Sequence, residues 1–89
     1  MPPTAEDFRQ ELYKVMNDAV KQAKDSVDIN AGELHGRLGD YPGPNHRMPN
    51  CCQVMKAAMA ADYGDVVMHE PPGGHGASLT IRYILPRRA

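Results

Sequence analysis

The chain of 89 residues has no long apolar run and no secretory signal. No stretch approaches the roughly 18 apolar residues of a transmembrane helix, and the N-terminal sequence MPPTAEDF has neither a basic region nor an apolar one. The only cysteines, Cys51 and Cys52, are adjacent, so no spaced pair exists for a disulfide framework. These absences predict a reduced, cytoplasmic protein that does not interact with a membrane.

A strong excess of one charge is also missing, since the net charge is -1. That value argues against a surface that is basic all over, as in many nucleic-acid-binding proteins. Residues 1–34 hold four Lys and Arg against seven Asp and Glu, whereas residues 35–89 hold six against four. The mild positive bias of the second part permits DNA binding there without requiring it.

The composition is that of one globular domain spanning residues 1–89. Hydrophobic residues make up 42% and charged residues 24%, which are ordinary values for a folded chain. No internal repeat or linker divides the sequence. A chain of this length can bury one modest core and lies close to the stability margin.

Capping residues and apolar spacing predict two helices with a short strand between them. Thr4 is a good N-cap, and apolar residues at steps of three and four favour a helix from Ala5 to about Ser26. An apolar-polar-apolar step at 27–29 indicates a minimal strand. Asn30, with Glu33 three residues later, then predicts a second helix over residues 31–38, with Gly39 just beyond its end.

A proline-rich loop over residues 40–49 leads into a third helix that ends near Ala61. Pro49 fits the first helical position, with Arg47 or Met48 near the cap, and Asn45 is a competing cap. The two cysteines point about 100° apart on this helix. We expect one of them in the core and the other half-buried.

The last third of the chain predicts a β-hairpin. Residues 65–69 form one strand, and a loop over residues 70–77 contains two prolines and three glycines. Residues 78–85 alternate apolar and polar side chains, which is typical of a half-buried strand. The fold class is therefore α+β.

This order of elements resembles the winged-helix form of the helix-turn-helix superfamily over nearly the whole chain. The fold implied has three helices, a short strand and a C-terminal β-hairpin wing. In that family the third helix enters the major groove of double-stranded DNA, and the wing contacts the backbone or the minor groove. The resemblance therefore implies a recognition helix at about residues 49–61 and a wing at 70–77.

A narrower resemblance covers residues 29–55 and 71–87. These runs are similar to the small module that accompanies HNH-type restriction endonucleases acting on modified DNA. The resemblance implies a restriction-modification context, reading of methylated DNA such as 5-methylcytosine, and a nuclease or regulator as partner. A 5-methyl group is read by apolar surface, which the proline-rich loop, Met48 and Ala57 could supply. The chain has no room for the catalytic segment itself.

The residues that could contact DNA follow from hydrogen-bonding chemistry. Asn and Gln pair with adenine edges and Arg with guanine, and Asn50 and Gln53 share one face of the third helix. Lys56 lies one turn further, where a phosphate contact is expected. Glycines in the wing allow close backbone approach. The predicted DNA-binding set is Asn45, His46, Arg47, Asn50, Gln53, Lys56, Gly73, Gly74, His75 and Arg82.

Each of these assignments has a plainer alternative. Asn50 could be a first-turn residue and Gln53 a solvated one, and residues 70–77 could be only a hairpin loop built of turn formers. The whole domain could instead be a winged-helix protein-protein interaction module. A homodimer through the first helix would suit a DNA binder with two half-sites.

Metal binding and catalysis are disfavoured. The chain has soft ligands, but they lack the spaced pairs of zinc sites: His46, Cys51, Cys52, His69 and His75. His35 on the second helix is expected to be a packed or surface residue. A Cys–His nucleophile would lack an acid partner and an oxyanion loop. We therefore expect no metal, no cofactor and no enzymatic activity.

Overall fold

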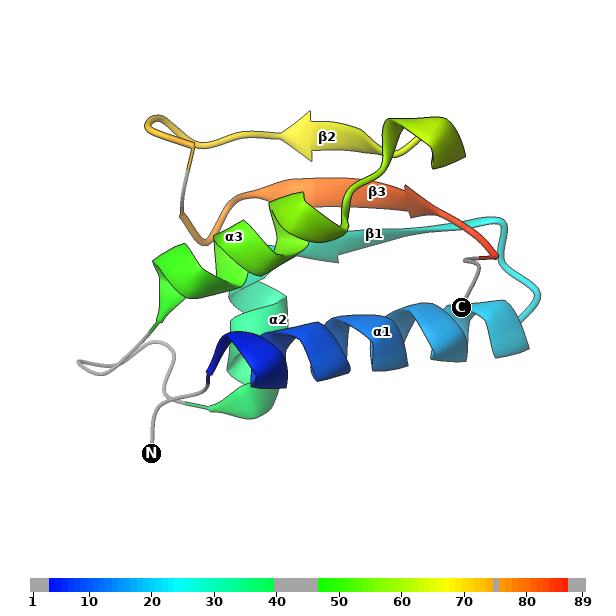
Figure 1. Cartoon of the computed structure of the whole chain (residues 1–89), viewed down its shortest axis with the longest axis horizontal. Helices are drawn as coiled ribbons and strands as arrows, with labels where there is room; N and C mark the ends of the chain where they lie inside the picture. The colour runs from blue at the N-terminus through cyan, green and yellow to red at the C-terminus, as the bar shows by residue number, and fades with distance from the viewer. Residues whose placement is uncertain (1–3, 40–46, 75, 87–89) are drawn as a thin grey trace.

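The computed structural model describes residues 4–39, 47–74 and 76–86. In chain order the elements are α1 (Ala5–Lys21), β1 (Ser26–Asn30), α2 (Ala31–Leu38), α3 (Met48–Ala58), the short 3-10 helix η1 (Ala61–Tyr63), β2 (Val66–His69) and β3 (Thr80–Ile84). α1 and α3 lie on one side of the sheet, and α2 follows β1 and packs against both helices (Figure 1). The α+β class with three helices and an antiparallel sheet is confirmed.

The sheet has the order β1-β3-β2, and both pairings are antiparallel. β2 and β3 form the hairpin that the sequence predicts, and the earlier strand β1 pairs with the other edge of β3. Side chains of β3 alternate between the two faces. Ile81 and Tyr83 are fully buried toward the helices, whereas Arg82 lies on the opposite face.

The core lies between the sheet and the helices. α1 supplies Phe8, Leu12 and Met16, all at most 1% exposed. Tyr83 reaches into the same core, and its hydroxyl donates a hydrogen bond of 2.7 Å to the carbonyl oxygen of Met55. A buried phenol requires such a partner, so this bond links the central strand to α3.

Local caps form where the sequence predicts them. The Thr4 side chain accepts a hydrogen bond from the Asp7 amide, and the Asp7 carboxylate accepts one from the Thr4 amide. The Asn30 side chain accepts from the Glu33 amide at 3.0 Å. These bonds satisfy amides that the first turn of a helix leaves unpaired, so both helix starts are set locally.

Two helix ends differ from the prediction. α1 ends at Lys21 and not at Ser26, because Ala23 takes a left-handed conformation with φ 62°. The backbone must turn there to start β1 at Ser26. α3 ends at Ala58 and not at Ala61, because Met59 is extended with ψ 134°.

The end of α3 is fixed by Asp65, which is buried at 7% exposure. Its carboxylate accepts hydrogen bonds of 2.8 Å from the amides of Ala60 and Ile84. Asp65 therefore joins the segment after α3 to the end of β3, and β2 begins one residue later than predicted. Among the described helices, none has the length and apolar character needed to cross a membrane.

Candidate nucleic-acid interface

The exposed face of α3 carries a mixture of polar and small apolar side chains, most of them uncharged. Pro49, Gln53 and Ala57 are exposed, and Asn50 and Lys56 flank them half-buried. The opposite face is buried in the core. No acidic residue occurs in α3, so its surface can approach a polyanion without direct repulsion from its own side chains.

Arg47, the residue before α3, is its N-cap and is exposed, but its side chain makes no capping hydrogen bond. Pro49 occupies the second helical position, one later than the best fit expected from the sequence. Asn45 and His46 lie outside the described residues. Arg47 therefore occupies the end of α3 where backbone amides and the helix dipole favour a negative group.

The start of α3 is held by a buried histidine of α2. The Arg47 amide donates a hydrogen bond of 2.7 Å to Nε2 of His35, and Nδ1 of His35 lies 3.1 Å from the carbonyl oxygen of Gly39. Because Nε2 accepts, Nδ1 carries the proton and donates to Gly39. The His35 ring is fully buried and packs edge-on against Phe8, with ring centroids 5.0 Å apart. Gly39 and Arg47 are thus both hydrogen-bonded to the same imidazole.

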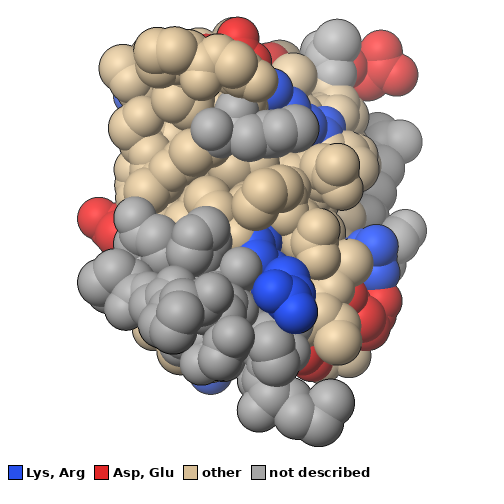
Figure 2. Space-filling model, turned by 90° about the vertical axis from the view of Figure 1, so that its left-hand side faces the viewer, with Lys and Arg blue, Asp and Glu red and all other residues tan. Residues whose placement is uncertain are grey.

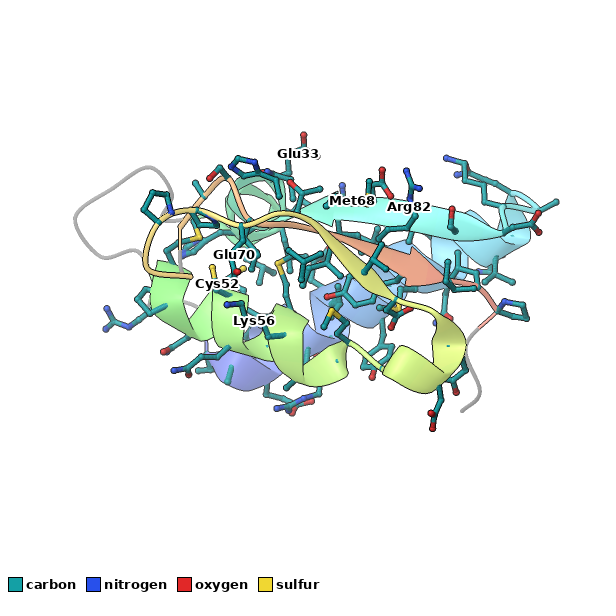
Figure 3. The ribbon with its side chains drawn as sticks, turned by 90° about the horizontal axis from the view of Figure 1, so that it is seen from above. Glu33, Cys52, Lys56, Met68, Glu70 and Arg82 are labelled. Atoms are coloured by element: carbon teal, nitrogen blue, oxygen red, sulfur yellow. The ribbon has the colours of Figure 1, made fainter. Side chains whose placement is uncertain are left out.

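The loop over residues 70–77 is fastened to the flank of α3. Nζ of Lys56 forms a 2.8 Å ion pair with Glu70, and Sγ of Cys52 lies 3.4 Å from both the amide and the carbonyl oxygen of Gly76. Figure 3 shows Cys52, Lys56 and Glu70 gathered on the α3 side of the sheet. The predicted recognition helix and the predicted wing are therefore neighbours in space.

Two glycines give the loop its shape. Gly73 and Gly74 have φ values of 80° and 81°, which L-residues rarely adopt. A Cβ atom on Gly74 would lie 3.0 Å from Nζ of Lys56, whereas one on Gly73 would meet open space. Gly73 is exposed, so its backbone is available to a ligand. His75 is outside the described residues.

Arg82 does not lie with the other predicted DNA-binding residues. It points away from α3, on the other side of the sheet from Lys56 (Figure 3). Its guanidinium forms two hydrogen bonds, of 2.7 and 3.2 Å, with the Asp28 carboxylate on β1. This contact with Arg82 lowers the pKa of Asp28. The structure thus separates Arg82 from the surface formed by α3 and the loop.

Two expectations about α3 are wrong. Met48 is only 5% exposed, so it cannot supply apolar surface to a methylated base, because it packs into the core below the helix start. Cys51 and Cys52 are both fully buried, since the loop at Gly76 covers the second thiol. Burial raises the pKa of Cys51 to about 12 and also raises that of Cys52. Both thiols therefore remain protonated near neutral pH.

Among the described residues, charge on this end of the molecule is sparse. Figure 2 shows the end at which α3 begins, with Lys and Arg side chains on a largely uncharged surface and acidic side chains toward its margins. Within the described ranges, no group of three His, Cys, Asp or Glu residues is placed to hold a metal ion. The surface is suited to hydrogen bonding with modest electrostatic attraction.

Sequence reasoning missed the residues that position this surface. His35, Cys52 and Glu70 make its supporting contacts, yet none was assigned a role in it. The local signal was His35 four residues before Gly39, a spacing that places two residues on the same face of a helix. The contacts with Arg47, Gly76 and Lys56 depend on how separate elements pack.

No family model, curated protein or solved structure matches this chain.

Proposed function

We propose that the protein binds double-stranded DNA, with the exposed face of α3 in the major groove and the loop at 70–77 against the adjacent backbone. The observation that carries the proposal is the composition and position of that face. Gln53 is exposed and Asn50 is half-buried, both close to the exposed Arg47, and α3 has no acidic residue. The hairpin loop is fastened alongside the helix, so both would meet one ligand.

The winged-helix assignment belongs to this proposal. Three helices, the sheet order β1-β3-β2 and a hairpin beside α3 are compatible with that fold. Within it, Asn50 and Gln53 would pair with base edges, each good bidentate pair giving about 1–3 kcal/mol of discrimination. Arg47 would contact guanine or phosphate at the helix start, and Gly73 would approach the backbone closely.

The proposal includes a preference for DNA that contains 5-methylcytosine. The apolar surface on the outer face of α3 comes from Pro49 and Ala57, which are exposed on either side of Gln53. Contact between such surface and a C5 methyl group distinguishes bases in the major groove. A nuclease or regulator that acts on modified DNA is the partner class that this preference would serve.

A second candidate is a protein-interaction module using the same face of α3. The observation in its favour is that Lys56 and Arg82 already have carboxylate partners, Glu70 and Asp28. Each would have to exchange or share that partner to contact a phosphate. With a net charge of -1, long-range attraction to DNA is weak.

Fluorescence anisotropy with labelled duplex pools separates these functions. One pool is unmodified and one carries 5-methylcytosine, and each is titrated at low and at physiological salt. We expect binding that weakens with salt and on Arg47→Ala, Asn50→Ala and Gln53→Ala. Lys24→Ala is the control, because Lys24 is exposed in the turn between α1 and β1. Figure 1 shows this turn at the opposite end of the molecule from the start of α3.

Each outcome of this experiment is decisive for one part of the proposal. Tighter binding to the methylated pool supports a modification reader, and equal binding rejects that preference while keeping DNA binding. Absence of binding to either pool at low salt overturns the DNA function and favours the protein-interaction module. A Lys24→Ala effect as large as that of Arg47→Ala would mean that the contacts are nonspecific.

A further inference from the structure

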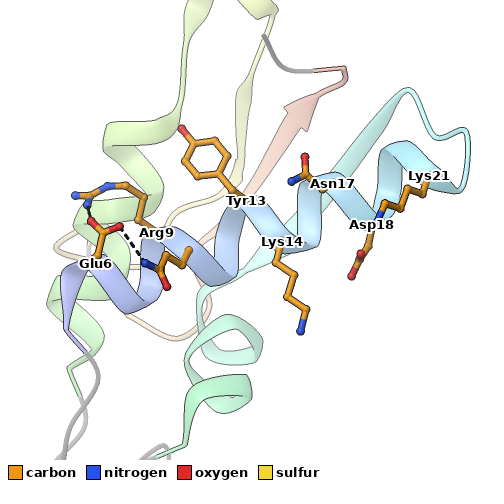
Figure 4. A pocket seen from close by; sticks show the side chains of 8 residues that line it. Glu6, Arg9, Tyr13, Lys14, Asn17, Asp18 and Lys21 are labelled. Atoms are coloured by element: carbon orange, nitrogen blue, oxygen red, sulfur yellow. Dashed lines mark hydrogen bonds and ion pairs between the residues drawn. The ribbon is translucent and has the colours of Figure 1, made fainter. Parts of the chain in front are cut away.

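The outer face of α1 is not used by the core or by the proposed DNA interface. A depression of about 540 Å³ lies on this face, and Figure 4 shows side chains that line it. Tyr13 is 41% exposed there, and Val20, two turns further along α1, is 39% exposed. The lining residues are Glu6, Arg9, Gln10, Tyr13, Lys14, Asn17, Asp18 and Lys21.

Five of these residues form a stripe along the helix. Glu6, Gln10, Tyr13, Asn17 and Lys21 follow one another at steps of three and four, so they share one side of α1. The stripe begins with an acid and ends with a base, and the aromatic residue lies at its middle. An amide side chain lies between the centre and each end. The stripe is therefore complementary to itself when its direction is reversed.

We propose that a second copy of this chain docks on the outer face of α1, with the two α1 helices antiparallel about a two-fold axis at Tyr13. Glu6 of each copy then faces Lys21 of the other, and Gln10 faces Asn17. The two tyrosine rings meet at the axis, where offset or edge-on contact is favourable. A parallel pairing would instead oppose Glu6 to Glu6 and Lys21 to Lys21.

The ends of the helix strengthen the antiparallel arrangement. Asp7 lies beside Glu6 in the first turn, so Lys21 of the second copy approaches two carboxylates. Glu6 is already paired with Arg9 in its own chain and would be shared between two cations. Antiparallel helices also bring opposite ends of their dipoles together.

The size and the centre of the contact predict a weak dimer. A helix of 17 residues is about 25 Å long, so one helix pair buries less than the roughly 1,600 Å² of a standard interface. Lys14 of each copy also lies close to the axis and repels its equivalent. The dimer is therefore concentration-dependent and weakened by salt, because its ion pairs lie at exposed ends.

Sedimentation equilibrium over about 10 µM to 1 mM protein, without DNA, measures this association. We expect Lys21→Glu to lower the association constant about tenfold, because both symmetric contacts become repulsive. The double variant Glu6→Lys with Lys21→Glu restores opposite charges at both ends and regains most of the loss. Lys14→Gln strengthens the association.

The controls distinguish a specific loss of association from a loss of folding and from a change in DNA binding. Lys24→Glu makes the same charge change just beyond α1, outside the stripe, and should leave the association unchanged. Circular dichroism melting of each variant establishes that it is folded. A monomer at all concentrations, or a Lys21→Glu defect that the double variant does not reverse, overturns the proposal. Anisotropy with DNA is independent of this result, because the stripe contains none of the proposed DNA contacts.

Discussion

The amide of Arg47 donates a 2.7 Å hydrogen bond to Nε2 of His35, across twelve positions of sequence. The acceptor is a fully buried ring, whose other nitrogen bonds to the Gly39 carbonyl oxygen. The residue before the candidate recognition helix is thus positioned by the helix that precedes it. The start of α3 is therefore held by a side chain that is fully buried in the core.

Replacing His35 should weaken both folding and DNA binding. His35→Ala removes a buried ring and leaves the Arg47 amide without this acceptor, so we expect a loss of about 3 kcal/mol in the free energy of unfolding. Urea denaturation measures it. Gly36→Ala is the control, because its new methyl group meets open space on α2 and should be neutral or stabilising. Equal denaturation midpoints for His35→Ala and wild type would contradict the role of this bond.

Replacing Asp65 should lower the free energy of unfolding far more than replacing the nearby Asp62. Asp65→Ala leaves the amides of Ala60 and Ile84 without their carboxylate acceptor, and we expect a loss of about 2–3 kcal/mol in unfolding free energy. Asp62 is exposed, so Asp62→Ala should change stability by less than about 0.5 kcal/mol. Thermal denaturation of the two variants gives the comparison. Similar melting temperatures would show that the buried carboxylate does not hold α3 to β3.

Alanine substitutions at Gly73 and Gly74 should distinguish the effect of backbone strain in the loop from the effect of displacing the Lys56 side chain. Gly73→Ala and Gly74→Ala both force a positive φ on alanine, at a cost of about 1 kcal/mol each in unfolding free energy. Only Gly74→Ala also meets Lys56, at 3.0 Å from Nζ, and so displaces that side chain from Glu70. We expect similar denaturation curves but a larger change in the salt dependence of DNA binding for Gly74→Ala. A larger change for Gly73→Ala would show that the loop backbone at Gly73, and not Lys56, makes the main contact at this flank.

Arg47 and Arg82 should differ in their effect on DNA binding. Arg47→Ala is expected to weaken binding and to lower the slope of log K against log salt by about 1, the signature of one phosphate contact. Arg82→Gln should leave both quantities unchanged, because Arg82 points to the other side of the sheet. Anisotropy titrations at several salt concentrations test the pair. An equal loss in Arg82→Gln would move the interface onto the open face of the sheet.

Cys51 should give the protein a characteristic loss of stability at alkaline pH. Burial raises the pKa of its thiol from 9.0 to about 12 on folding. The unfolded state therefore loses its proton first, and the stabilisation present below pH 9 declines as pH rises toward 12. We expect the unfolding free energy of Cys51→Ala to be lower overall but to fall less steeply across this window than that of the wild type. If the unfolding free energies of Cys51→Ala and the wild type fell in parallel with pH, the raised pKa of the Cys51 thiol would be contradicted.

Much of the fold could be predicted because its signals are local. Thr4 and Asn30 cap helices with bonds to residues three positions ahead, and the alternation over residues 78–85 marks the central strand. The end of α1 was missed because Ala23 continues the apolar stripe, while its left-handed φ follows from the need to reach β1. No composition signal marks that turn.

The candidate surface was predictable only in part. Asn50 and Gln53 follow from helical spacing, and the structure leaves Gln53 exposed and Asn50 half-buried. The burial of Met48 and the pairing of Arg82 with Asp28 involve distant segments, so local patterns carry no information about them. Whether a basic side chain remains available to a ligand depends on whether a carboxylate lies next to it. Strand register and packing determine which carboxylates are neighbours.

The order of the sheet also determines when the molecule can fold. β3 is the last of the described strands in sequence, yet it lies in the middle of the sheet and pairs with both β1 and β2. During synthesis the three helices and both edge strands leave the ribosome before the strand that joins them. Until residues 80–84 emerge, β1 and β2 have no partner strand, and the apolar surface of the helices is not covered by the central strand. Contacts between distant segments form late and slowly, so this interval is when aggregation and chaperone binding are most expected.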